Sequence, residues 1–133
     1  MKIYLAASFY DMRVETVADQ LEEAGHVITC KWWKDRKVKS LNLRKHAMRD
    51  VRGVRQADVF VQLLPGRKGA ATELGLALGC RFTRHKPRIL IWTDDVDVLH
   101  SKKSNVFWFM PEVEVIVGPN AGAQIIAALK KGR

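Results

Sequence analysis

Short apolar runs alternate with segments of helical periodicity, and this alternation constrains the fold more than any other feature of the sequence. Residues 59–64 and 89–92 are almost wholly apolar, which is typical of strands buried on both faces of a parallel sheet. Residues 3–8, 27–32 and 113–117 also have strand patterns, and 106–109 is a further candidate. The sequence therefore predicts a parallel sheet of five or six strands.

Apolar residues at helical spacing predict the elements between these strands. The first helix is expected over residues 12–24, with Gly25 as its stop, and the second from Leu43 to near Ala57. A third begins near Ala70, and a last helix covers about 120–130. The stripe of the second helix is Leu43, Ala47, Val51 and Val54.

Regular alternation of strands and helices predicts one α/β domain over residues 1–133. The expected architecture is a single doubly wound parallel sheet in a three-layer sandwich, Rossmann-like in class and flavodoxin-like in strand order. Residues 31–42 and 94–105 each follow a strand, so they are predicted to line a ligand site at the carboxyl ends of the sheet.

The charge of the chain favours anionic partners, because 23 Lys and Arg outnumber 14 Asp and Glu and give a net charge of +9. Nucleic acid, an anionic membrane surface and a phosphorylated small molecule all satisfy this charge. No apolar stretch approaches the roughly 20 residues of a membrane span, so we expect no membrane insertion and a cytoplasmic location.

Motifs for metals and common cofactors are absent from the sequence. Cys30 and Cys80 form no CxxC pair, and the four histidines are scattered, so no metal site is predicted. Neither GxxxxGK[ST] nor GxGxxG occurs, which argues against an NTPase and a nicotinamide enzyme. We therefore expect no cofactor.

The segment from residue 63 to residue 75 carries the strongest functional signal, as a buried strand leads through a Gly/Pro loop into a helix. Its helix N-terminus would attract anions, and Arg67 and Lys68 add charge. Glu73 would lie in the first turn, where the helix dipole alone favours a carboxylate. Ala70 cannot complete a capping box with Glu73, and the stripe of Glu73 with Ala77 turns it inward. The pattern is compatible with either a catalytic or a purely structural carboxylate.

Two further features have both structural and functional interpretations. Asp50 lies in the second helix next to Val51 of its apolar stripe, where an ordinary surface ion pair is also compatible with the pattern. Trp32 and Trp33 lie among lysines and an arginine, a mixture that can stack a base. Strand alternation would place one tryptophan in the core and the other, taken as Trp33, at the site.

Three patterns together resemble the nucleoside 2-deoxyribosyltransferase family. They are residues 3–9 with Tyr4, then Asp50 eight residues before Asp58 and a strand, then residues 69–75 with Glu73. The family includes transferases that exchange bases on 2-deoxyribose and N-glycosidases that hydrolyse nucleoside 5′-monophosphates. The resemblance implies a flavodoxin-like fold and cleavage of the bond between C1′ and the base.

By this resemblance Glu73 is the nucleophile, Asp50 helps to protonate the leaving base, and Tyr4 lies near the nucleophile. Asn105 resembles a segment that reaches into a neighbouring subunit, which implies a homodimer or a larger homo-oligomer. Arg67 departs from the family, which has an aspartate or a serine six residues before the glutamate, and an arginine suits a phosphate. The residues expected to bind substrate are Ser8, Phe9, Trp33, Gly66, Arg67, Gly69 and Asn105.

The sequence thus predicts an enzyme that cleaves the N-glycosidic bond of nucleosides or their 5′-monophosphates through a glycosyl-Glu73 intermediate. The sugar would pass to another base or to water. The alternative is a non-catalytic module that binds nucleotides or nucleic acid through its basic loop and tryptophans. Nucleic acid is a possible partner but a less favoured one than a small nucleoside or nucleotide.

Overall fold

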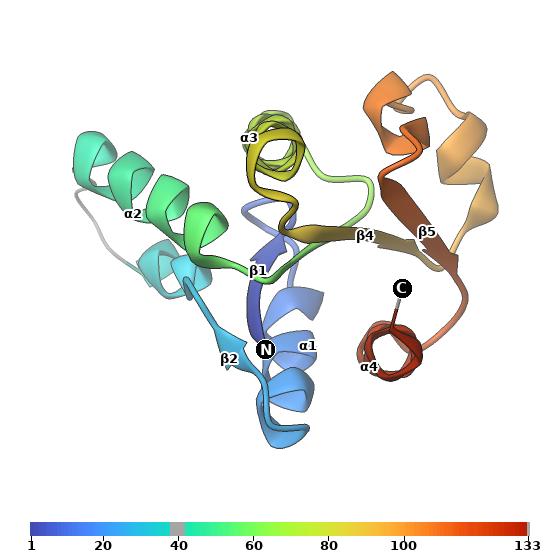
Figure 1. Ribbon diagram of the computed structural model, residues 1–133, viewed down its shortest axis with the longest axis horizontal. Helices are drawn as coiled ribbons and strands as arrows, with labels where there is room; N and C mark the ends of the chain where they lie inside the picture. The colour runs from blue at the N-terminus through green and yellow to red at the C-terminus, as the bar shows by residue number, and fades with distance from the viewer. Residues whose placement is uncertain (38–41, 133) are drawn as a thin grey trace.

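The computed structural model describes residues 1–37 and 42–132 and contains one five-stranded parallel sheet in the order β2-β1-β3-β4-β5 (Figure 1). This order confirms the predicted flavodoxin-like doubly wound architecture. The strands are β1 Lys2–Ala6, β2 Val27–Ile28, β3 Val59–Leu63, β4 Arg88–Thr93 and β5 Val113–Val117. The helices are α1 Arg13–Glu23, α2 Leu43–Gln56, α3 Lys68–Arg84 and α4 Ala121–Lys131, with 3₁₀ helices η1 Trp32–Lys37, η2 Val96–His100 and η3 Val106–Phe109.

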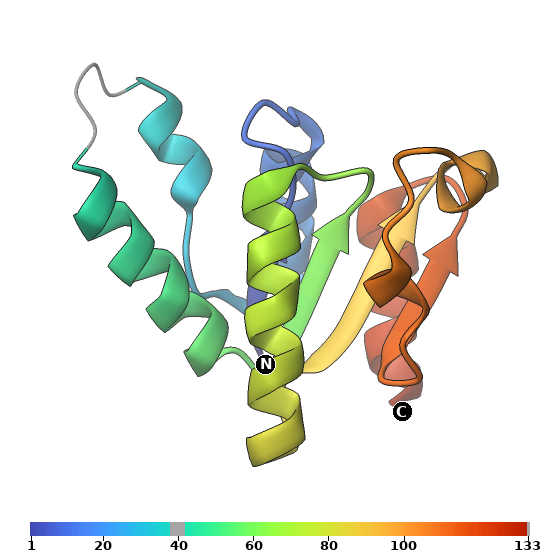
Figure 2. The same ribbon diagram turned by 90° about the horizontal axis from the view of Figure 1, so that it is seen from above.

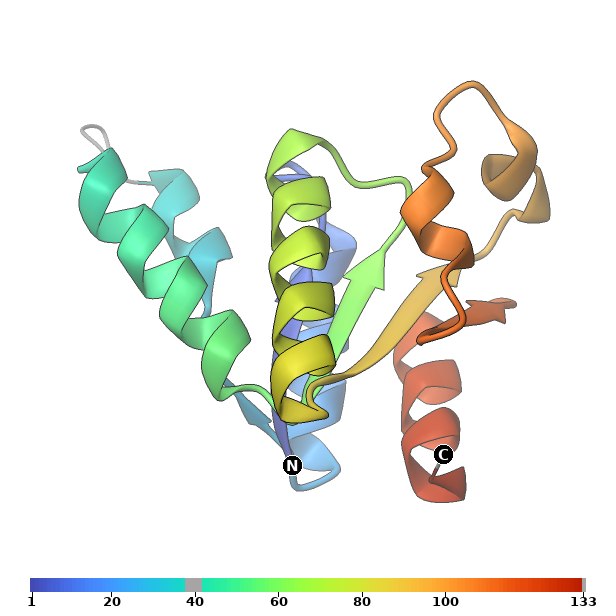
Figure 3. The same cartoon turned by 45° about the horizontal axis from the view of Figure 1, so that its top comes forward.

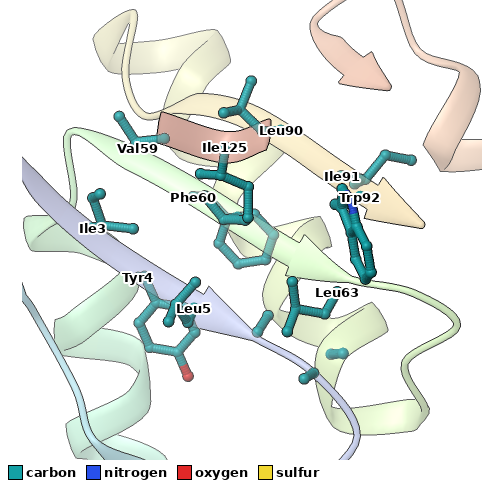
Figure 4. Close-up of a cluster of buried hydrophobic side chains, with 14 of the residues drawn as sticks. Ile3, Tyr4, Leu5, Val59, Phe60, Leu63, Leu90, Ile91, Trp92 and Ile125 are labelled. Atoms are coloured by element: carbon teal, nitrogen blue, oxygen red, sulfur yellow. The ribbon is translucent and has the colours of Figure 1, made fainter. Parts of the chain in front are cut away.

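Helices cover both faces of the sheet. α1 and α4 pack on one face, and α2 and α3 lie on the other (Figure 1). The core lies along β1, β3 and β4, whose apolar side chains fill the space on both sides of the sheet (Figure 4). Every residue of β3 is buried, which explains why its sequence is apolar apart from Gln62. Among the described residues, no helix has the length and apolarity to cross a membrane.

Two predicted strands are corrected by the structure. The strand expected over 27–32 ends at Ile28, because the chain leaves the sheet and Trp32 begins η1. The candidate strand over 106–109 is the 3₁₀ helix η3, because the side chain of Asn105 accepts a hydrogen bond from the Phe107 backbone N–H at 2.9 Å and closes a tight turn.

Helix α2 contacts the rest of the protein differently from the prediction. Leu43 and Val51 are exposed, and only Gly53 and Val54 of this helix are buried. α2 packs near its C-terminal end and diverges from α3 toward its N-terminus, as Figure 2 and Figure 3 show. The cavity described below occupies the space at the wide end. The apolar spacing predicted the helix correctly but not its degree of burial.

Candidate active site

A cavity of about 740 Å³ opens at the carboxyl ends of β1 and β3. Strand order reverses between these two strands, and ligands of doubly wound sheets bind at such points. Its wall comes from the loop after β1, from η1, from the N-terminal part of α2 and from the start of α3. The lining residues are Ala7, Ser8, Phe9, Tyr10, Trp32, Asp35, Leu43, His46, Arg49, Asp50, Arg67, Lys68, Gly69, Ala70 and Glu73.

Glu73 lies on the cavity wall in the second turn of α3, because the helix begins at Lys68 rather than near Ala70. This corrects the placement of Glu73 in the first turn. The helix dipole acts mainly within the first turn, so it does not explain a carboxylate at this position. Burial raises the pKa of Glu73 from its ordinary value of 4.5 to about 8. The protein therefore maintains a partly buried carboxyl group, at a cost in desolvation, at the edge of a cavity.

Tyr4 contacts the Glu73 carboxyl group from the core side of the sheet. It lies in the middle of β1, is fully buried, and stacks on the Phe60 ring with 5.9 Å between ring centroids. Its hydroxyl donates a hydrogen bond to Glu73. Gly53 of α2 lets that helix approach, since a Cβ there would lie 3.0 Å from both the Tyr4 ring and Cys30. The tyrosine is thus fixed by packing on both of its sides.

Asp50 faces the cavity from α2 and is held by two donors. Arg49 Nη2 lies 3.3 Å from Asp50 Oδ1, and Cys30 Sγ donates to the same oxygen at 3.4 Å. Burial and the negative charge of Asp50 raise the pKa of Cys30 to about 12, so its thiol keeps its proton. Asp50 therefore acts as a hydrogen-bond acceptor on this wall.

Asp35, His46 and Arg49 form a polar group on the same wall, and sequence reasoning did not find it. His46 Nδ1 lies 2.7 Å and Arg49 Nη2 2.6 Å from Asp35 Oδ2. Burial alone would raise the pKa of Asp35, but the hydrogen bonds and charges of Arg49 and His46 lower it overall. The spacing of His46 and Asp50 at i and i+4 on α2 was a usable signal, since it places them on one helix face.

The basic loop before α3 lies at the opposite side of the cavity. Arg67 occupies the N-cap of α3, Lys68 and Gly69 follow in its first turn, and all three line the cavity with exposed side chains or backbone. Gly66 does not line it. Its φ of +66° shapes the turn, and a Cβ there would lie 2.6 Å from the Gln62 amide. Unpaired backbone N–H groups and two cations are therefore available to an anion.

The aromatic side chains that line the cavity, here called its aromatic wall, are Phe9, Tyr10 and Trp32; Trp33 is not among them. Trp32 Nε1 donates to the Leu5 carbonyl at 2.7 Å, and its ring lies 6.2 Å from that of Phe9. Trp33 is also buried, but it lies in a separate depression beside α1. The assignment of Trp33 to the site is corrected, because both residues belong to η1 and strand alternation does not apply to them.

The loop after β1 is held against η1 by contacts of Arg36. Arg36 of η1 donates hydrogen bonds to the backbone carbonyls of Phe9 and Asp11, and its guanidinium lies over the Trp32 ring. Ser8 and Phe9 belong to this loop, and both line the cavity as predicted. The hydrogen bonds of Arg36 fix the backbone of the loop in place.

The second predicted wall, residues 94–105, contributes nothing to this cavity. Asn105 caps η3 within its own chain and is absent from the lining. The first wall, residues 31–42, contributes Trp32 and Asp35, while residues 38–41 lie outside the described residues. Within the described ranges, no cluster of three or more His, Cys, Asp or Glu side chains could hold a metal ion.

The fold is similar to that of a solved enzyme. The structure of the Clostridium botulinum CMP N-glycosidase BcmB matches 98% of this chain and 99% of its own, with a TM-score of 0.62 and 16% sequence identity. No protein-family model matches the sequence. A search of curated proteins also finds no match.

Proposed function

We propose that this protein cleaves the N-glycosidic bond of nucleosides or nucleoside 5′-monophosphates. The observation that carries the proposal is the pair of carboxyl groups on facing walls of one cavity, with Glu73 on α3 and Asp50 on α2. Breaking the bond between C1′ and the base creates positive charge at C1′, and a carboxylate can stabilise and then capture that carbon. The similarity in fold to a CMP N-glycosidase supports this assignment.

In the proposed reaction Glu73, whose pKa of about 8 means that it must first release its proton near neutral pH, attacks C1′ as the carboxylate while the electron pair of the C1′–N bond moves to the base. The base gains a proton and departs, which leaves the sugar as an ester of Glu73. Water, or the nitrogen of another base, then attacks C1′ and releases the carboxylate. Tyr4 orients Glu73 through its hydrogen bond, and Asp50 assists departure of the base from the facing wall.

The basic loop supports a nucleotide as substrate. Arg67 and Lys68 lie at the N-terminus of α3, where backbone N–H groups and positive side chains together suit a phosphate. Trp32 and Phe9 on the aromatic wall suit the flat base. We assign the 5′-phosphate to the loop and the base to the wall formed by η1 and α2.

Base release identifies this activity directly. The protein is incubated with a panel of nucleosides and their 5′-monophosphates, with and without a free acceptor base, and the products are separated by chromatography. Glu73→Ala should abolish base release without unfolding the chain, whereas Glu23→Ala, on the exposed face of α1, should not change it. A covalent sugar adduct on the peptide that contains Glu73 is expected by mass spectrometry. Retained activity in Glu73→Ala would remove the assignment of the nucleophile.

A second candidate is a non-catalytic module for nucleotides or nucleic acid, and the charge of α2 favours it. This helix carries Arg44, Lys45, Arg49, Arg52 and Arg55 against a single acid. Nucleic-acid binding that depends on these contacts would weaken steeply with salt, whereas base release would not require nucleic acid. A salt titration with DNA and RNA beside the product assay separates the two candidates.

We also propose a homodimer or larger homo-oligomer in which Asn105 completes a neighbouring site. Exposed apolar side chains next to it, including Val106, Phe107 and Phe109, support an interface in this region. Sedimentation should show at least a dimer, and Asn105→Ala should impair activity more than folding. A fully active monomer would contradict the proposal.

A further inference from the structure

His46 and Asp35 form a pair that faces the cavity, although neither has a role in the reaction described above. His46 Nδ1 and Asp35 Oδ2 are 2.7 Å apart, and both side chains are mostly shielded from solvent. The short contact assigns the Nδ1 proton to the hydrogen bond with Asp35, because a carboxylate accepts and does not donate. Nε2 then has no partner among the described residues and is free to exchange a proton with a bound ligand.

The position of His46 matches the base end of the site. It lies one helical turn before Asp50 on α2, at i and i+4, so both side chains reach the same wall. Trp32, which is suited to stack the base, lies on η1 together with Asp35. The phosphate loop of Arg67 and Lys68 belongs to α3. His46 is therefore placed with the base subsite, away from the helix that holds the phosphate.

The leaving base needs a proton donor, and Asp50 is arranged as an acceptor. Its Oδ1 already receives hydrogen bonds from Arg49 and from the Cys30 thiol. An imidazolium paired with a carboxylate is, in contrast, a common proton donor in enzyme sites, and such donors contribute about 10²- to 10⁴-fold to rates.

We infer that His46 is a further catalytic residue, which donates its Nε2 proton to the leaving base, and that Asp35 is the positioning residue that holds the imidazolium. This inference rests on the proposed function. As the C1′–N bond breaks, its electron pair goes to the base, the proton from Nε2 neutralises the base, and Glu73 forms the ester. In the second step the neutral Nε2 takes a proton from the attacking water, so the enzyme returns to its starting state. Asp50 then assists by accepting an N–H from the base.

The test compares substrates that do and do not need a proton. In 7-methylguanosine 5′-monophosphate or 3-methylcytidine 5′-monophosphate the base is already a cation, so it leaves as a neutral molecule. His46→Gln should slow release of the unmodified base by about 10²- to 10⁴-fold, and the loss should shrink to within about tenfold on the methylated analogue of the same base. Asp35→Asn should show a smaller loss with the same dependence on the leaving group. His100→Gln, on the exposed side of η2, is the matched control.

A second measurement keeps the inference testable where the methylated nucleotide is not accepted. Added imidazole should restore base release in His46→Ala, because a small molecule can enter the cavity, and it should not restore Glu73→Ala. Three results would overturn the inference: unchanged rates in His46→Gln, equal losses on both substrates without imidazole rescue, or dependence on the leaving group in Asp50→Asn instead. If Glu73→Ala is inactive while His46→Gln is unaffected, the proposed function stands and only this inference fails. A wild-type protein without any base release rejects the function itself.

Discussion

Glu73→Gln is expected to stabilise the protein at alkaline pH and to change its stability little near pH 5. Burial raises the pKa of Glu73 from 4.5 to about 8. Between these values the native protein holds a proton that the unfolded chain has released, so its stability falls as the pH rises through this window. The glutamine amide has nearly the same shape and still offers an oxygen to the Tyr4 hydroxyl, but it does not ionise.

The magnitude follows from the two pKa values. A tenfold change in a proton equilibrium is worth about 1.4 kcal/mol. Linkage between about pH 5 and pH 9 then predicts that the wild-type protein loses about 4 kcal/mol of unfolding free energy relative to Glu73→Gln. Urea unfolding of both proteins at acidic, neutral and alkaline pH measures this difference, and all other titrating groups cancel because the two chains share them.

The same experiment has a clear contrary result. A constant difference in unfolding free energy at every pH would show that the Glu73 carboxyl group ionises as it does in water, which would refute the argument from burial. Glu23→Gln, on the exposed surface of α1, should run parallel to the wild type throughout.

The other substitutions test the facing wall, the loop and the packing of Tyr4. Asp50→Asn keeps the shape of the side chain but removes the charge of the acceptor that faces the base, so turnover at saturating nucleotide should fall by roughly 10- to 100-fold, the loss of about 1.5 to 3 kcal/mol expected for a hydrogen bond to a charged group; a near-normal rate would return Asp50 to an ordinary helix position. We expect kcat/KM to be roughly tenfold or more higher for 5′-monophosphates than for nucleosides, since a desolvated charge-assisted pair supplies about 1.5 to 3 kcal/mol. Arg67→Ala should remove this preference. If bare nucleosides are preferred and the variant changes nothing, the loop is only an exposed rim of the cavity. Gly53→Ala places a Cβ 3.0 Å from the Tyr4 ring, and the overpacking cost of about 1 to 3 kcal/mol should exceed the gain of about 1 kcal/mol in helix propensity. Its Tm and its rate of base release should both decrease, and an unchanged Tm would mean that the ring can move aside.

The central strands of the fold could be predicted because strands buried on both faces have a recognisable local sequence, a short run of mostly apolar residues. β3 and β4 are buried on both faces and are therefore mostly apolar, with Gln62 inside β3 and Arg88 and Thr93 at the two ends of β4 as the exceptions. The edges were less predictable. β2 has only two residues, and the aromatic run 106–109 has strand propensity but is closed into η3 by the side chain of Asn105. Local capping overrode propensity there.

The site could be predicted where one segment contains the whole signal. Glu73 and the basic loop share one stretch of chain, and the sequence alone drew attention to both. The contact between Asp35 and His46 depends on how η1 meets α2, and no periodicity in either segment reports it. Trp33 was misplaced for the same reason, because its orientation depends on an element that the sequence pattern did not predict.

The arrangement of the chain ends relative to the cavity has a practical consequence. Met1 precedes β1, and α4 runs back toward the amino ends of the strands, so both ends of the chain lie on that side of the sheet (Figure 2, Figure 3), whereas the cavity opens at the carboxyl ends of β1 and β3. All described cavity-lining residues fall between Ala7 and Glu73. The protein can therefore be fused or tethered to a surface through either end with its cavity facing outward.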